Sequence, residues 1–170
     1  RWLNISSVDT PAFGHPNETG MSRIGDFAED ASGMFWMGTG HGALKFNPAV
    51  GISSIQRYHA GNSQMMNGWC RNVEIAPDGT IWFSSYATVW GDGGLARYNP
   101  STNTWTKFVN YGDGDLGIQP RPGGGYYVWT RNFVTGKAAR WTSTTGTWTE
   151  YNVAVGNPGN IVGKTATDAS

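Results

Sequence analysis

The stretch DASGMFWMGTGHGALKFNP, residues 30–48, holds two short apolar runs, a glycine-rich turn between them and an Asn-Pro stop. A turn of Asp or Gly type followed by an aromatic run with one tryptophan returns in PDGTIWFSSYA at 77–87 and in PGGGYYVWTRN at 122–132. The three tryptophans stand 46 and 47 residues apart: Trp36, Trp82 and Trp129. The opening stretch is therefore one unit of a repeat.

The segments around each tryptophan run repeat as well. A basic residue before an aromatic recurs in GALKFNP, GLARYNP and AARWTS, at 42–48, 94–100 and 138–143. Alternating segments follow at 54–60, 104–110 and 147–153, and a looser segment precedes each unit. The unit is thus about 45 residues long with four strands, a length typical of the blade of a β-propeller. No segment has a convincing helical period, so we expect an all-β fold.

The ends of the chain match parts of this unit. RWLN at 1–4 matches the third strand of the other units, and TDAS at 167–170 matches EDAS at 29–32. We expect three complete blades and an incomplete blade at each end. An open arc leaves unpaired edges, which favours an excerpt of a larger ring of about six to eight blades over a small closed ring or an assembly of copies. The expected units of this single propeller segment are 1–20, 21–68, 69–114, 115–159 and 160–170.

Composition narrows the classes of partner. Lys+Arg and Asp+Glu are both 12, so the net charge is zero and nucleic-acid binding is not expected. No apolar run approaches the roughly 18 residues that a membrane-spanning helix needs. Cys70 is the single cysteine, which excludes a disulfide within the chain, and we expect it to act as a small, half-buried apolar residue.

The sequence resembles a known group of propellers. EDASGMFWMGTGHGALKFNP and APDGTIWFSSY followed by GGLARYNPSTNTWTKF are similar to the repeats of bacterial two-component-regulator ectodomains and of streptogramin-lyase-like propellers. The resemblance implies a secreted, periplasmic or cell-surface bacterial protein. It also implies that the first strand of each blade lines a central channel and that the 2–3 and 4–1 loops share one face. The metal-binding histidine and acid set of streptogramin lyases has no residue-by-residue match here.

The loops of that face supply the candidate ligand-binding residues. Loop 84–94 is the longest 2–3 loop, whereas the loop at 38–42 turns in five residues, so the added residues are not needed to join two strands. Aromatic rings there can stack on sugars while charged neighbours bond hydroxyl groups, or they can fold back over the blade edge. The candidates are Tyr86, Trp90, Asp92, His41, Arg131, Trp69 and Tyr111.

Two acidic pairs are weaker candidates. Asp26 and Glu74 share one position when Asp30 is aligned with Asp78, and two carboxylates on neighbouring blades can work as acid and base. A polar lining of the channel explains them equally well. Asp113 and Asp115 alternate as in a calcium loop, although the pattern lacks the closing acid and suits a solvated turn. We therefore expect no cofactor, with calcium as the one alternative.

Three classes of function remain open. The first is a binding or interaction module that recognises a glycan or a partner protein and does no chemistry. The second is a propeller enzyme, a lyase or glycoside-cleaving, that uses Asp26 and Glu74. The third is a structural component of a surface assembly. Besides the ligand, the expected partners are the remaining blades of a larger propeller or additional copies of the chain.

Overall fold

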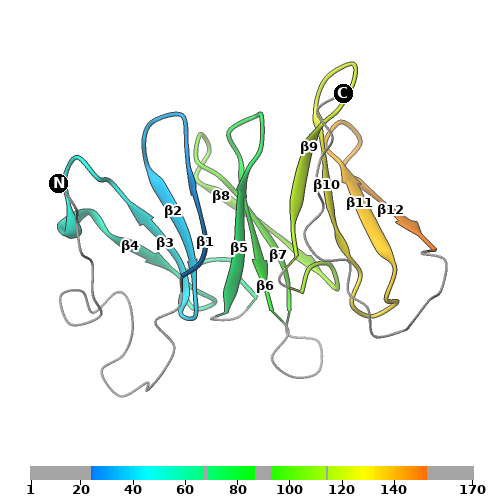
Figure 1. Cartoon of the computed structure of the whole chain (residues 1–170), viewed down its shortest axis with the longest axis horizontal. Coiled ribbons are helices and arrows are strands. Elements are labelled where there is room, and N and C mark those ends of the chain that lie inside the picture. The colour runs from blue at the N-terminus through cyan, green and yellow to red at the C-terminus, as the bar shows by residue number, and fades with distance from the viewer. Residues whose placement is uncertain (1–23, 67–68, 87–92, 114, 153–170) are drawn as a thin grey trace.

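The computed structural model describes residues 24–66, 69–86, 93–113 and 115–152, which form three four-stranded antiparallel sheets (Figure 1). The first sheet contains β1 (Ile24–Glu29), β2 (Phe35–Thr39), β3 (Gly42–Phe46) and β4 (Gln56–Tyr58), with a 3-10 turn, η2 (Ile52–Ser54), before β4. The second contains β5 (Cys70–Ile75), β6 (Ile81–Ser85), β7 (Gly94–Asn99) and β8 (Thr104–Val109). The third contains β9 (Gly117–Pro120), β10 (Tyr126–Arg131), β11 (Ala138–Thr142) and β12 (Thr147–Tyr151).

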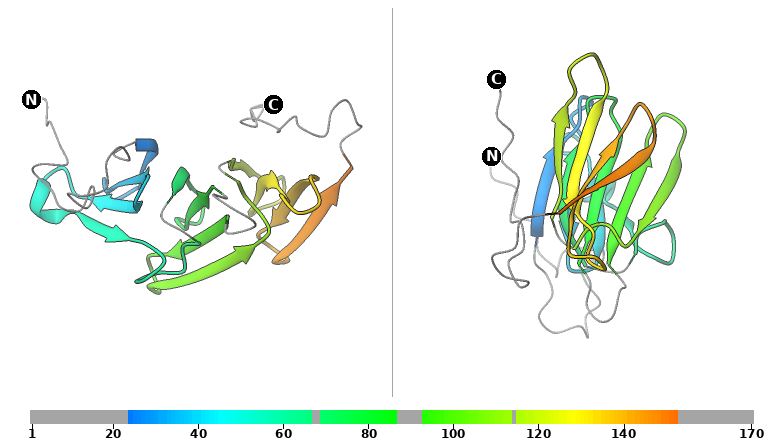
Figure 2. Two further views of the ribbon diagram at one scale, coloured as in Figure 1. Left: turned by 90° about the horizontal axis from the view of Figure 1, so that it is seen from below. Right: turned by 90° about the vertical axis from the view of Figure 1, so that its right-hand side faces the viewer.

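In every sheet the strands pair in sequence order, each with the next. The three sheets stand side by side along an arc, with β1, β5 and β9 on its inner side and β8 and β12 on its outer side (Figure 2, left). This is the arrangement of propeller blades, and it confirms the predicted all-β propeller fold. The segments 1–20 and 160–170, which we expect to belong to incomplete blades, lie outside the described residues.

The repeated tryptophans occupy the same position in all three blades. Each lies on the second strand and faces the basic residue of the third strand, in the pairs Trp36–Lys45, Trp82–Arg97 and Trp129–Arg140. The cation lies 5.3, 5.7 and 5.6 Å from the centroid of its tryptophan ring. The basic-aromatic motif of the third strand therefore places a cation over the tryptophan of its neighbour.

Two of these tryptophans join one blade to the next. Trp36 is fully buried against Tyr98 of the second sheet, with ring centroids 5.5 Å apart. Trp82 is fully buried against Trp141 of the third sheet at 5.0 Å. Trp129 is half-buried and contacts Tyr151 of its own sheet at 5.6 Å. The predicted packing between blades thus holds for the first two, and among the described residues Trp129 has no neighbouring blade.

The indole N–H groups of the three tryptophans all find an acceptor. Trp36 donates to a carboxylate oxygen of Asp30 at 2.9 Å, and Trp129 donates to the amide oxygen of Gln119 at 3.0 Å. Trp82 donates to the hydroxyl of Tyr126 on the next blade at 3.4 Å. Because a buried donor without a partner is costly, these acceptors are part of what allows the large rings to sit inside.

Two expectations from composition also have structural counterparts. Cys70 is a free thiol that is 2% exposed, which is deeper than the half-buried position expected, and its burial raises the pKa of the thiol. No helix in the described part of the chain is long and apolar enough to cross a membrane.

Candidate functional site

The connections from second to third strand and from one blade to the next meet at one end of the sheets, the lower end in Figure 1. At this end of the second blade, Tyr86 and Trp69 extend the pairing of β6 with β5 by one step. The Tyr86 N–H donates to the carbonyl of Trp69 at 3.0 Å. Their rings lie 6.4 Å apart, and both residues are half-buried. Two of the predicted aromatic residues are therefore neighbours in space.

A third residue, which the sequence analysis did not select, completes this group. Cys70 pairs with Ser85 and Asn72 pairs with Ser84, so Arg71 is the extra residue of a β-bulge. A bulge redirects the side chain that it carries. Here the guanidinium of Arg71 lies 4.0 Å from the centroid of the Tyr86 ring, a cation–π contact, and the residue is exposed. We call Trp69, Arg71 and Tyr86 the aromatic–arginine site.

An acidic residue of the next blade borders this site. The charge of Arg71 acts on the carboxyl group of Asp115, which precedes β9. Burial raises the pKa of Asp115, and Arg71 opposes that rise only in part. One carboxylate oxygen of Asp115 is buried with no hydrogen-bond partner among the described residues. Asp115 is half-buried, with one oxygen beneath the surface, whereas Arg71 is exposed.

The chain that leads from the second blade to the third is fixed along the third blade. Gly112 N–H donates to the carbonyl of Arg131 at 2.9 Å, and Phe133 N–H donates to that of Asn110 at 3.1 Å. Asp113 forms an ion pair with Arg131. Gly112 has a φ of 91°, and a Cβ there would lie 2.7 Å from Leu95, so this close approach requires glycine. The connection thus places Asp113 and Asp115 at fixed positions.

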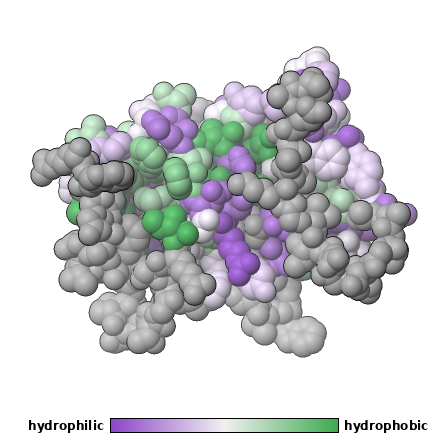
Figure 3. Space-filling model, viewed as in Figure 1, coloured by the Kyte–Doolittle hydropathy of each residue, from purple (hydrophilic) through white to green (hydrophobic). Residues whose placement is uncertain are grey.

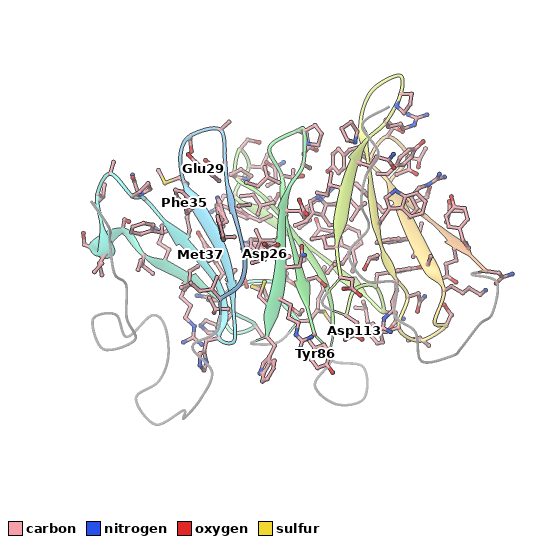
Figure 4. The ribbon with its side chains drawn as sticks, viewed as in Figure 1. Asp26, Glu29, Phe35, Met37, Tyr86 and Asp113 are labelled. Carbon is pink, nitrogen blue, oxygen red and sulfur yellow. The ribbon has the colours of Figure 1, made fainter. Side chains whose placement is uncertain are left out.

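In the view of Figure 4, Tyr86 and Asp113 both lie at the lower end of the sheets, whereas Asp26 lies higher, between β1 and β5. Figure 3 shows that hydrophilic residues gather toward the lower centre of this face and hydrophobic residues toward the first blade. The exposed apolar residues Ile24 and Phe27 belong to β1.

The remaining predicted ligand residues have other surroundings. Tyr111 stacks on Trp148 at 3.9 Å, and its hydroxyl donates to Glu150 at 3.4 Å. His41 is buried in the β2–β3 turn, where its carbonyl accepts a hydrogen bond from Arg57 at 2.8 Å. Tyr111 thus packs on the third blade, and His41 is held within the first blade. Trp90 and Asp92 lie outside the described residues, so their predicted contacts stay predictions.

The two channel carboxylates do not share one position. Asp26 pairs with Gly38, whereas Glu74 pairs with Trp82, so the counterpart of Glu74 in the first sheet is Ala28, opposite Trp36. The alignment of Asp26 with Glu74 is therefore wrong by two residues. Both oxygens of Asp26 accept backbone hydrogen bonds, from the N–H of Phe27 at 3.0 Å and from that of Val73 at 3.3 Å. Asp26 thus ties β1 to β5.

Gly25 is the bulge residue of β1, so it is the counterpart of Arg71 in the first sheet. A bulge leaves no mark in sequence, since one extra residue with no partner looks like any other. The neighbouring Arg71 and Tyr86 could have been found only from the pairing register.

Asp113 and Asp115, the acidic pair considered for calcium, have different neighbours. Asp113 is paired with Arg131, and Asp115 is bordered by Arg71. Among the described residues no three His, Cys, Asp or Glu side chains come together as a possible metal-ligand group.

Comparison with known proteins gives relatives in structure alone. No family model matches the sequence, and no curated protein matches it. The extracellular domain of the hybrid two component system BT3049 from B. thetaiotaomicron superposes with a TM-score of 0.56 at 17% identity, over 76% of this chain and 17% of that one. The extracellular domain of the one component system BT4673 from the same organism gives 0.57 at 15% identity, over 81% and 18%.

A third solved structure, described as a gluconolactonase in its protein family, gives a TM-score of 0.55 at 14% identity. The match covers 89% of this chain and 55% of the other protein's chain. The chain therefore spans under a fifth of the two ectodomains and about half of the third protein. At these identities the likeness shows the fold, and it agrees with the type of propeller that the sequence resembles.

Proposed function

We propose that this propeller segment is part of a binding module that works outside the cell or at its surface and recognises a glycan at the aromatic–arginine site. The observation that carries the proposal is the group of Trp69, Tyr86 and Arg71, with two aromatic rings 6.4 Å apart and a guanidinium above one of them. Half-buried aromatic rings bind the apolar faces of sugars, and an adjacent guanidinium donates hydrogen bonds to sugar oxygens.

The proteins that share this fold support a location outside the cell. Two of the structures that share the fold are extracellular domains of bacterial signalling systems, which is why we place this chain on the same side of the membrane. The predicted ligand residues Trp90 and Asp92 follow Tyr86 along the chain and lie outside the described residues. We propose that they extend the same surface.

No observation favours the alternative of a cleaving enzyme built on Asp26 and Glu74. The two residues stand at different register positions, and both oxygens of Asp26 already accept backbone hydrogen bonds. A general acid or base needs a carboxyl oxygen that can reach its substrate. A protein ligand in place of a glycan remains the second candidate, because aromatic and arginine residues are also the common anchors of protein interfaces.

The experiment is a glycan-array screen followed by calorimetric titration of any glycan that binds. Tyr86→Ala and Trp69→Ala should each weaken binding by roughly tenfold or more, since stacking on a ring is worth about 1–3 kcal/mol. Phe27→Ala is the matched control, because Phe27 is an aromatic residue that is 65% exposed on another blade. Glycan binding that survives both site substitutions, or that is lost in the control, would contradict the proposal.

A further inference from the structure

The guanidinium of Arg71 has an unusual combination of support and freedom. The guanidinium lies 4.0 Å from the centroid of the Tyr86 ring, a cation–π contact that favours one position of the group. Among the described residues its side chain makes no hydrogen bond and no ion pair, and the residue is exposed. A guanidinium that is stacked through its face keeps its N–H donors in the plane of the group, directed sideways. Arg71 is therefore preorganised to donate.

The charges around Arg71 leave this cation dominant at the surface. Asp113 is already paired with Arg131. Asp115 is the other nearby acid, and the carboxyl oxygen that lacks a partner is buried. A ligand that approaches Trp69 and Tyr86 from solvent thus meets an aromatic surface beside one exposed positive charge.

We infer that the site selects a saccharide that carries a carboxylate, a uronic acid residue, over its neutral counterpart. This inference rests on the proposed function and names the chemical class of its ligand. The sugar ring would lie against Trp69 and Tyr86, and its carboxylate would accept two parallel hydrogen bonds from Arg71. Arginine and carboxylate match in geometry as a planar, bidentate pair, and a charge-assisted pair is stronger than a neutral hydrogen bond.

Of the two bulges in the repeat, the one that carries Arg71 lies at the junction of the second and third blades, so the selectivity for a carboxylate is expected there. The counterpart in the first blade is Gly25, whose place for a Cβ lies 2.6 Å from the backbone oxygen of Arg71. The bulge of the first blade thus carries no side chain, and that of the second blade carries the cation. One carboxylate per bound ligand is the expected stoichiometry at this surface.

The test compares matched pairs of probes, namely uronic acid oligosaccharides and the same oligosaccharides after reduction of their carboxyl groups to hydroxymethyl groups. The purified protein should bind a uronate oligosaccharide at least roughly tenfold more tightly than its reduced form, and Arg71→Gln should abolish that difference. Arg71→Lys should restore only part of it, because lysine keeps the charge and lacks the planar fork. Arg121→Gln is the control, since Arg121 lies at the opposite end of the third blade and bonds Thr144 at 3.1 Å.

Three results would overturn the inference. Binding of neutral glycans that depends on Trp69 and Tyr86 but not on Arg71 would refute the carboxylate and leave the proposed function standing. Uronate binding that is unchanged in Arg71→Gln would assign recognition to another group. Failure of every probe on the array to bind would remove the proposed function together with the inference. Thermal unfolding of each variant shows whether a loss of binding comes from a loss of folded protein.

Discussion

Removal of the Trp82 side chain should cost more stability than removal of the equivalent Trp129, and the difference measures the packing of one blade on the next. Trp82 is fully buried and contacts Phe108 at 5.1 Å and Trp141 at 5.0 Å. A buried Trp→Ala substitution typically costs about 3–5 kcal/mol, from lost burial and from the cavity that remains. The hydroxyl of Tyr126 keeps its bond with Thr80 at 3.0 Å, so no orphaned polar group adds to that cost.

Trp129 is the matched control. It is half-buried and contacts Tyr151 and Arg140, both in its own sheet. We expect Trp129→Ala to cost roughly half as much as Trp82→Ala, because less area leaves the solvent and the surroundings can relax. For a chain of 170 residues, a loss of about 3–5 kcal/mol lowers the melting temperature by on the order of 10 °C.

Urea unfolding followed by circular dichroism gives both the free energy of unfolding and its dependence on denaturant. A lower slope in Trp82→Ala would show that the third blade separates before the others, since the slope follows the surface exposed in one transition. Equal and small costs for the two substitutions would refute the reasoning, because they would mean that Trp82 does not hold the second and third blades together.

Three further predictions concern single contacts. Burial raises the pKa of Asp30, but the hydrogen bonds that it accepts outweigh burial and lower the pKa below 3.8. The ionised Asp30 therefore stabilises the native protein above about pH 4, and this contribution is lost as the pH falls. Asp30→Asn should be less stable than the native protein above about pH 4 and closer to it in acid; melting curves from pH 2 to 7 test this, and an unchanged profile would contradict it. Gly112→Ala should cost about 1–3 kcal/mol more than Gly123→Ala, because both have positive φ but only the first Cβ would collide with other residues; equal urea midpoints would contradict this. Gly25→Ala should weaken ligand binding at the aromatic–arginine site as well as stability, because its Cβ would push on the backbone of Arg71; calorimetric titration with unchanged affinity would argue against that coupling.

The repeat made the fold predictable from sequence. The period of the tryptophan runs and the turn residues between them define four strands per unit, and these local signals agree with each other along the chain. The equivalence of Trp36, Trp82 and Trp129 followed from their spacing, and the structure confirms it in the register of each sheet. The half-buried state of Trp129 could not be predicted, because burial depends on which blade stands next to it.

The candidate site was predictable only in part. Loop position was enough to select Trp69 and Tyr86, which are neighbours in the structure. It also selected Tyr111, which contacts Trp148 of the third blade, and His41, which contacts Arg57 of the first blade. Alternation tells which strand residues share a face, but the partner of a loop residue is set by the path of the whole chain.

The bulges explain why Arg71 escaped detection and why it matters. β1 and β5 each contain one residue without a partner, and they fill that position in opposite ways, with Gly25 and with Arg71. At Gly25 the two inner strands approach so closely that a side chain would meet the backbone of the next blade. At Arg71 the side chain instead crosses the end of its own blade and rests on Tyr86. A repeat that is regular in its tryptophans therefore differs at its bulges, and at the bulge of β5 the register directs the side chain of Arg71 toward Tyr86, where we propose that it meets a ligand.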